Sequence, residues 1–271
     1  MTCRHSLVAL LLFALALSVA TPAGSQVKLA QRIKARDGAE MVLIPGGPFG
    51  SGVSRPAVEQ LVRSLREPMV SFYETELPET TKDLRDFYID KYEVTNELFR
   101  RFVDVTSSAQ NRFSSYKSLS RGRQPVVGIG WQEAERYCAW ASKRLPTELE
   151  WEKAARGTDR RTWPWGNEPD EKRFNGRAMG NRSAVDVGSF PAGDSPYGVS
   201  DMAGNVWEMT SSHWPKESSA SRVMKGGSYL NNLADARVTV RWAAQNEEAG
   251  ATWLGFRCAM DTSQATQIDK K

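Results

Sequence analysis

Beyond Gly157 the sequence loses the periodic apolar pattern that predicts helices and strands. Roughly a hundred residues of this part are rich in Gly, Pro, Asn, Asp and Trp, and such a stretch must satisfy its backbone groups through aromatic anchors or bound ions. We therefore expect a loop-rich second half, with short strands at residues 223–225 and 256–260. Six tryptophans are available as anchors: Trp163, Trp165, Trp207, Trp214, Trp242 and Trp253.

The first half carries clearer signals for regular elements. Residues 41–44 and 87–92 are short apolar runs, and the first ends at a Pro-Gly-Gly turn, so each run predicts a strand. Apolar residues recur on one face between Pro56 and Pro68, which predicts a helix over residues 54–67. This helix is either an inserted lid or a surface helix that packs on the core.

Three more helices follow from capping residues and helical spacing. Thr95 suits the N-cap of a helix with Phe99 and Phe102 on its inner face. Residues 132–143 place Cys138 on the apolar side of a second helix. A capping box, Thr-Glu-Leu-Glu at 147–150, starts a third helix that runs to about Arg156.

The first 23 residues have the pattern of a secretory signal peptide. Arg4 supplies the positive start, and residues 7–19 are apolar but too few to span a bilayer. An uncleaved membrane anchor is the alternative. We expect an exported protein, periplasmic or secreted, without stable membrane insertion after cleavage. Its expected parts are a signal peptide at 1–23, a flexible leader at 24–38, one domain at 39–262 and a tail at 263–271.

The charge balance argues against nucleic acid or an anionic membrane as a partner. The chain has 36 basic and 32 acidic residues, and loss of Arg4 with the signal lowers the formal charge from +4 to +3. Cleavage also leaves two cysteines, Cys138 and Cys258. In an oxidising compartment such a pair predicts a structural disulfide, with two buried free thiols as the alternative.

Eight short motifs occur in one order over residues 40–260, and together they are specific. The chain resembles the formylglycine-generating enzyme family, also called the sulfatase-modifying-factor domain. That resemblance implies an α+β fold of the C-type-lectin type, rich in irregular loops that calcium stabilises. The motifs are MVLIPGG at 41–47, FYIDKYEVTN at 87–96, PVV at 125–127, KRLPTELEWE at 143–152, YG at 197–198, GNVWE at 204–208, GGS at 226–228 and GFRC at 255–258.

The resemblance also implies a calcium site in the loop at 201–208. Calcium takes six to eight oxygens from carboxylates and backbone carbonyls. The implied ligands are the side chains of Asp201 and Glu208 and the carbonyls of Gly204 and Val206. The alternative is a turn capped by its own carboxylate without a metal. A second family site would begin at Asn175, but no carboxylate lies within residues 176–183, so we do not expect it to form.

The family's copper and iron chemistries lack their ligands in this sequence. Family oxidases hold copper through two thiolates shortly after Gly-Gly-Ser, whereas residues 230–237 contain no sulfur. The resemblance places Cys138 and Cys258 in a scaffold disulfide, so they cannot substitute. The family's iron oxygenases need several histidines, and His213 alone remains after signal cleavage. We therefore expect neither copper nor iron, and formylglycine-generating oxidase activity is not expected.

A pocket can persist without these metals, and three functions follow. The first is a noncanonical or non-catalytic member that binds a peptide or protein in a surface groove. The second is a periplasmic tailoring oxidoreductase that resembles the family member in pyoverdine maturation, with Glu208, Asp235, Arg241 or Tyr229 as acid, base or orienting group. Sulfatase activation comes third. The pocket candidates are Trp207, Ser228, Tyr229, Asn231 and Arg241.

Overall fold

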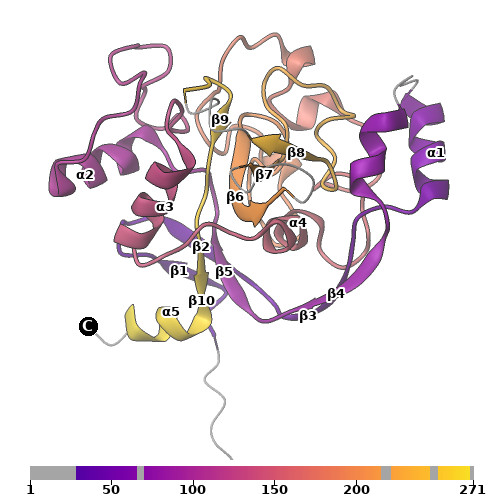
Figure 1. Cartoon of the computed structure of the whole chain (residues 1–271), viewed down its shortest axis with the longest axis horizontal. Helices are drawn as coiled ribbons and strands as arrows, with labels where there is room; N and C mark the ends of the chain where they lie inside the picture. Colours follow the sequence, from indigo (N-terminus) through magenta and orange to yellow (C-terminus); the bar gives the residue numbers. More distant parts are fainter. Residues whose placement is uncertain (1–28, 66–69, 215–220, 245–249, 269–271) are drawn as a thin grey trace, which may run out of the picture.

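A computed structural model describes residues 29–65, 70–214, 221–244 and 250–268. The predicted signal peptide at 1–23 lies outside the described residues. Two four-stranded sheets and a two-stranded ribbon are combined with helices and long loops (Figure 1). The helices are α1 (Arg55–Leu65), α2 (Asn96–Thr106), α3 (Trp131–Trp140), α4 (Glu148–Arg156) and α5 (Thr262–Ile268), with 3-10 turns η1 (Val70–Glu76), η2 (Glu171–Arg173), η3 (Arg177–Met179) and η4 (Pro191–Gly193).

The first sheet joins the two ends of the domain. Its strand order is β1-β2-β5-β10, and all neighbouring strands are antiparallel. Because β10 pairs with β5, the last strand of the chain lies beside an early one. The strands of this sheet are β1 (Arg32–Lys34), β2 (Glu40–Ile44), β5 (Phe87–Asp90) and β10 (Ala259–Asp261).

The structure departs from the predicted domain limits at both ends. Residues 24–38 were predicted to form a flexible leader, yet Arg32–Lys34 form β1 and pair with β2. Residues 263–271 were predicted to be a tail, yet Thr262–Ile268 form α5 and Ala265 packs under the sheet. Both segments are short, so pairing and packing with distant residues stabilise them rather than local propensity.

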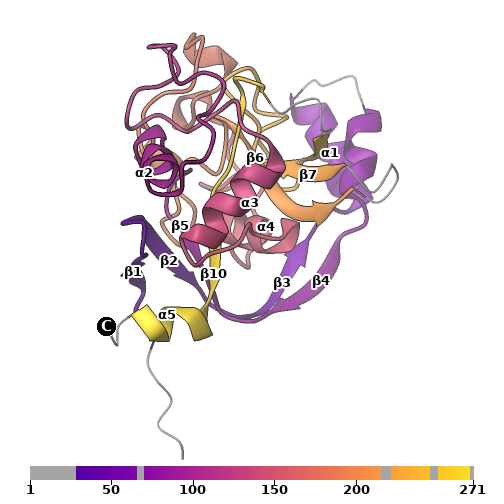
Figure 2. The same ribbon diagram turned by 60° about the vertical axis from the view of Figure 1, so that its left-hand side comes forward.

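The second sheet positions the loops of the second half. Its strand order is β8-β7-β6-β9, with β6 and β9 parallel, and the β3–β4 ribbon leads to α1 at the far side of the molecule from α2 (Figures 1 and 2). The predicted strand at 256–260 is correct only for residues 259 and 260, which belong to β10, since β9 ends before it at Gly255. The remaining strands are β3 (Gly47–Ser51), β4 (Thr80–Leu84), β6 (Trp207–His213), β7 (Arg222–Lys225), β8 (Arg241–Ala244) and β9 (Leu254–Gly255).

The helices form where local sequence signals start them. The Thr95 hydroxyl accepts a hydrogen bond from the Leu98 N–H at 3.3 Å and caps α2. Thr147 and Glu150 cap α4 reciprocally, as predicted. The predicted helix at 54–67 is α1, which packs with η1 through a small apolar cluster around Val58 and Tyr73.

The disulfide prediction is confirmed by a bond between Cys138 and Cys258. It joins α3 to the segment between β9 and β10, and both residues are fully buried in the largest apolar cluster.

Residues 157–206 contain no strand and only three 3-10 turns, as the loss of periodicity predicted. Trp163 anchors this region, because its indole N–H donates to the Leu233 carbonyl at 2.9 Å. None of the helices that the structure describes has the length and apolar content needed to cross a membrane.

Candidate functional site

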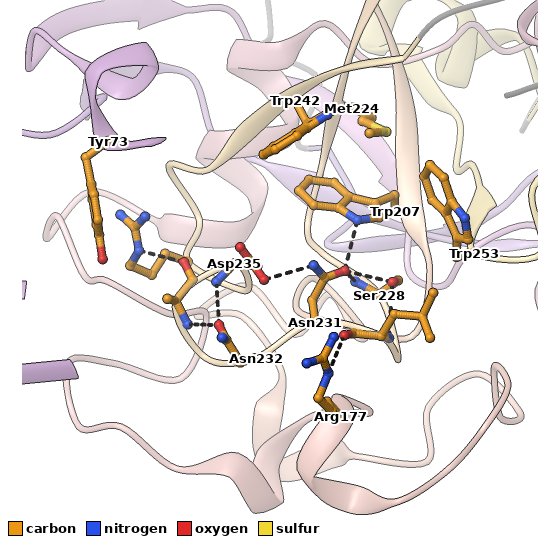
Figure 3. A pocket seen from close by; sticks show the side chains of 13 residues that line it. Tyr73, Arg177, Trp207, Met224, Ser228, Asn231, Asn232, Asp235, Trp242 and Trp253 are labelled. Carbon is orange, nitrogen blue, oxygen red and sulfur yellow. Dashed lines mark hydrogen bonds between the residues drawn. The ribbon is translucent and has the colours of Figure 1, made fainter. Parts of the chain in front are cut away.

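A pocket of about 510 Å³ opens where the second sheet meets η1, η3 and the loop at 228–237 (Figure 3). This volume suits a small molecule or a few side chains of a peptide. One side of the pocket is aromatic and apolar, and it consists of Trp207, Met224, Trp242 and Trp253, while Tyr73 lies apart from them beside Arg237 (Figure 3). The other side is polar: Arg177, Ser228, Asn231, Asn232, Asp235 and Arg237.

Asn231 connects the two sides of the pocket. Its amide oxygen accepts hydrogen bonds from the Trp207 indole N–H at 3.0 Å and from the Ser228 hydroxyl at 2.8 Å. Its amide N–H donates to the Asp235 carboxylate at 2.9 Å. Because one side chain holds an indole, a hydroxyl and a carboxylate, the pocket surface is set before any ligand arrives.

A buried ion pair holds η1 against the pocket. Both Arg237 Nη atoms donate to the Glu76 carboxylate, at 2.7 and 2.8 Å. The Thr239 hydroxyl contacts the same carboxylate, and the Arg237 guanidinium lies 4.2 Å from the centre of the Tyr73 ring. η1 is therefore a fixed wall of the pocket. Of the two roles considered for the helix at 54–67, packing on the core fits this arrangement.

Three of the five pocket candidates from the sequence line the pocket, namely Trp207, Ser228 and Asn231. Tyr229 does not; it is buried in a separate apolar cluster, and its hydroxyl contacts that of Thr252 at 3.0 Å. Arg241 does not line the pocket either, because it pairs with Glu148 on α4 at 2.8 Å. Side chains alternate along a strand, so the first residue of β8 faces away from Trp242.

Sequence reasoning did not place Tyr73, Arg177 or Met224 in the pocket. Tyr73 reaches it from η1, which is far from the second sheet in the sequence, so no local signal could reveal that contact. Trp242 and Trp253 were considered only as anchors for the loops. One signal was available for Met224, since its strand ends directly before the Gly-Gly-Ser motif, whose Ser228 lines the pocket.

The comparisons with known proteins agree on the family. A family model described as the sulfatase-modifying factor enzyme 1-like domain matches residues 26–262. The chain belongs to this family. It is 35% identical to the inactive C-alpha-formylglycine-generating enzyme 2 of Bos taurus, with 81% of this chain and 87% of the relative aligned. It is 30% identical to the formylglycine-generating enzyme of Mus musculus, with 82% and 75% aligned.

Solved structures of similar fold support the predicted fold class. PvdO from Pseudomonas aeruginosa superposes with a TM-score of 0.70 at 24% identity. The superposition covers 87% of this chain and 100% of PvdO. CarF superposes with a TM-score of 0.60 at 18% identity, covering 83% of this chain and 99% of that one. The prediction of an α+β fold of the formylglycine-generating-enzyme type is confirmed.

The sulfatase-modifying-factor pocket of this chain contains no thiol. Residues 228–237 carry none, and Cys138 and Cys258 are joined to each other in the core. Soft thiolate ligands are what selects monovalent copper, so the donor set of this pocket does not fit that metal. His213 lies at the exposed end of β6 beside Arg222 and does not line the pocket.

The residues implied as calcium ligands fit that ion only in part. Glu208 is fully buried, and its carboxylate accepts two hydrogen bonds from Arg257 and one from the Trp151 indole, each at 2.7 Å. A carboxylate already neutralised by a guanidinium does not fit a calcium ligand, because the cation and the guanidinium would repel one another. In this structure Glu208 acts as an ion-pair partner.

Two more buried carboxyl groups, those of Glu93 and Asp201, lie near Glu208. Glu93 and Asp201 are 1% and 7% exposed, and neither forms an ion pair with Arg257, whose guanidinium is hydrogen-bonded to Glu208 and acts on them only through its charge. Burial and the neighbouring Asp201 carboxylate raise the pKa of Glu93 well above its usual range. The Glu93 carboxyl group is hydrogen-bonded to that of Asp201, which requires that one of the two hold a proton. Glu93 is therefore an acidic neighbour of the loop that the sequence analysis missed.

The backbone of this loop is held by Asn175. Its carbonyl accepts from the Asn205 N–H at 2.9 Å, and its side-chain N–H donates to the Asn205 amide oxygen at 3.0 Å. Gly204 has φ +72, and a Cβ there would come within 2.5 Å of the Asn175 carbonyl, so only glycine fits. Asn175 thus supports the loop through hydrogen bonds.

No group of three histidine, cysteine or acidic residues within the described parts of the chain is arranged to hold a metal.

Proposed function

We propose that this protein is an exported member of the family that binds a peptide or protein segment in the pocket without copper-thiolate chemistry. The carrying observation is a pocket with aromatic walls and no thiol, in a chain whose family fold is otherwise complete. Aromatic side chains with a few fixed polar groups line ligand pockets, and tryptophans are common among the residues that dominate binding at protein interfaces.

The rim of the pocket supports this proposal. Leu230 and Trp242 line the pocket and are 45% and 42% exposed. Met179 is 39% exposed and lies at the end of η3, two residues from the lining residue Arg177. Exposed apolar side chains gathered at a pocket mouth lower the cost of docking a partner that covers them. Export is supported by the disulfide, since such bonds persist in oxidising compartments.

Selection from a displayed peptide library tests the proposal. We expect enrichment of peptides that bind the wild-type protein and bind Leu230→Asp about tenfold more weakly or worse, because the charge would be buried at the contact. Val105→Asp is the matched control, since Val105 is 71% exposed on α2 and lies outside the pocket. Equal loss in both variants, or no enriched peptides, would contradict peptide binding in this pocket.

Acid–base chemistry on a bound ligand is the second candidate, in line with a tailoring enzyme. Its support is Asp235, a half-buried carboxylate in the pocket lining.

Sulfatase activation is tested directly by co-expression with a Cys-x-Pro-x-Arg peptide. We expect mass spectrometry to find no formylglycine, and detection of the aldehyde would overturn the argument from the missing thiols.

A further inference from the structure

The polar side of the pocket carries one carboxylate without an ionic partner. Asp235 is half-buried, and its Oδ2 accepts a hydrogen bond from the Asn231 amide at 2.9 Å. Within the parts of the chain that the structure describes, no lysine or arginine forms an ion pair with Asp235. A partly desolvated anion of this kind gains more from a cationic ligand than an exposed one does.

The two arginines of the lining do not cancel this charge. Arg237 is neutralised by Glu76, which accepts from both of its Nη atoms. Arg177 is exposed at the rim, where its Nε donates to the Leu230 carbonyl at 3.0 Å. Water and salt screen an exposed guanidinium, so Asp235 dominates the electrostatics of the interior.

The opposite side of the pocket offers aromatic faces for the same cation. In Figure 3 the indoles of Trp207, Trp242 and Trp253 lie above Asn231 and Asp235, and all five residues line the same pocket. Aromatic faces attract ammonium and guanidinium groups and also cover the apolar stem of such side chains. A carboxylate opposite indole rings is complementary to a long basic side chain.

We propose that the pocket recognises a basic side chain of its peptide ligand, with the cation at Asp235 and the methylene stem against the tryptophans. This inference rests on the proposed function, because it names the ligand class of the same pocket. Asn231 contributes as a positioning residue, since its amide fixes both the Asp235 carboxylate and the Trp207 ring.

Two short peptides that differ in one charge test the proposal. The probes are acetyl-Gly-Phe-Lys-Phe-Gly-amide and the same peptide with Nε-acetyllysine, which keeps the stem and removes the charge. Binding is followed through the indole N–H signals in nitrogen-15 NMR spectra. We expect the lysine peptide to bind about tenfold more tightly than the acetylated one, and this preference to fall with added salt.

Asp235→Asn isolates the charge, because asparagine keeps an oxygen that accepts from Asn231. We expect this variant to bind both peptides equally, at the affinity of the acetylated peptide. Asp104→Asn makes the same charge change on the exposed face of α2 and should leave the preference intact. A folding defect in Asp235→Asn would appear as a change in the whole NMR spectrum.

Other outcomes separate this inference from the proposed function. Equal binding of both peptides by the wild-type protein overturns cation recognition but leaves peptide binding standing. Tighter binding of a peptide with Glu in place of Lys also overturns it, since Arg177 would then dominate. If neither peptide binds at about 1 mM, the inference fails. The proposed function fails with it only if library selection also yields no binder.

Discussion

Arg257 donates two hydrogen bonds of 2.7 Å to the Glu208 carboxylate, and neither residue is exposed to solvent. The same guanidinium donates to the carbonyls of Asp90, Lys91 and Ser200, so it joins the first sheet to the loop before β6. Arg257 of the Gly-Phe-Arg-Cys motif thus supports the Gly-Asn-Val-Trp-Glu motif at 204–208 through a buried ion pair with Glu208.

Calcium binding is expected to depend on Asp201 rather than on Glu208. We expect calcium to stabilise the protein by about 3 kcal/mol at a hundredfold excess over the dissociation constant. Asp201→Ala should abolish this gain. Glu208→Gln should lower stability equally with and without calcium, because it removes the partner of Arg257. Unfolding monitored with calcium and with a chelator measures both effects. Loss of the gain in Glu208→Gln alone would show that Glu208 binds the ion.

Removing one partner of the buried ion pair between Glu76 and Arg237 should strongly destabilise the protein. Glu76→Gln leaves a buried guanidinium without its counter-charge and is expected to cost about 3–5 kcal/mol. Glu74→Gln is the control in the same 3-10 turn, because the Glu74 pair with Arg55 is exposed and should be worth less than about 1 kcal/mol. Urea unfolding measures both losses. Similar losses in the two variants would show that Arg237 finds another partner.

Removal of the disulfide should destabilise the protein through the unfolded state. The bond closes a loop with a sequence separation of 120, for which chain entropy gives about 4–5 kcal/mol. The double variant Cys138→Ala, Cys258→Ala is expected to lose this amount in chemical unfolding. Thiol titration of the denatured, unreduced wild-type protein should find neither cysteine free. Titration of both would favour the alternative of two buried thiols.

The indole N–H of Trp207 should matter for ligand binding. Trp207→Phe keeps an aromatic ring but removes the hydrogen bond to Asn231, and we expect about 3–10-fold weaker binding of library-selected peptides. Trp165→Phe is the control, since it also removes an indole hydrogen bond, to the Glu168 carbonyl, but lies outside the pocket. Calorimetric titration measures the affinities. Unchanged affinity in Trp207→Phe would place the ligand elsewhere.

A buried triad should give stability a distinctive dependence on pH. Lys143 contacts Asp37 at 2.6 Å and Asp90 at 2.9 Å, so two carboxylates share one ammonium. Burial raises the pKa of Asp90 to about 6, despite the attraction of Lys143. A raised carboxyl pKa penalises folding above pH 6, and the penalty disappears as the pH falls toward the unfolded value near 3.8.

The variant Asp90→Asn tests whether Asp90 makes the protein more stable as the pH falls. The wild-type protein should gain up to about 3 kcal/mol relative to Asp90→Asn as the pH falls from 7 to 4, because only the wild type takes up the proton. Urea unfolding at several pH values measures the difference between the two proteins. No gain, or a loss, in the stability of the wild type relative to Asp90→Asn over this range would mean that Lys143 keeps Asp90 ionised throughout.

The sequence predicted those features whose causes are local. Thr95 and the Thr147–Glu150 capping box start their helices wherever the helices pack, because the cap lies within one turn of the backbone. The family resemblance carried by the motifs at 204–208 and 226–228 predicted that Trp207 and Ser228 line a pocket, and both do. Two cysteines in a chain that we expected to be exported predicted a disulfide bond between them. Family motifs supplied the fold, because their order along the chain is itself sequence information.

Tertiary structure alone decided which distant groups meet. Glu76 and Arg237 are separated by 161 residues, and their pairing brings Tyr73 into the pocket. β1 exists because β2 lies beside it, and Glu208 faces Arg257 rather than an open ion site because the segment after β9 passes there. The proposed role of Asp235 likewise depends on the tryptophans that line the same pocket. A sequence specifies residue types and local turns, but burial and charge compensation arise only between neighbours in space.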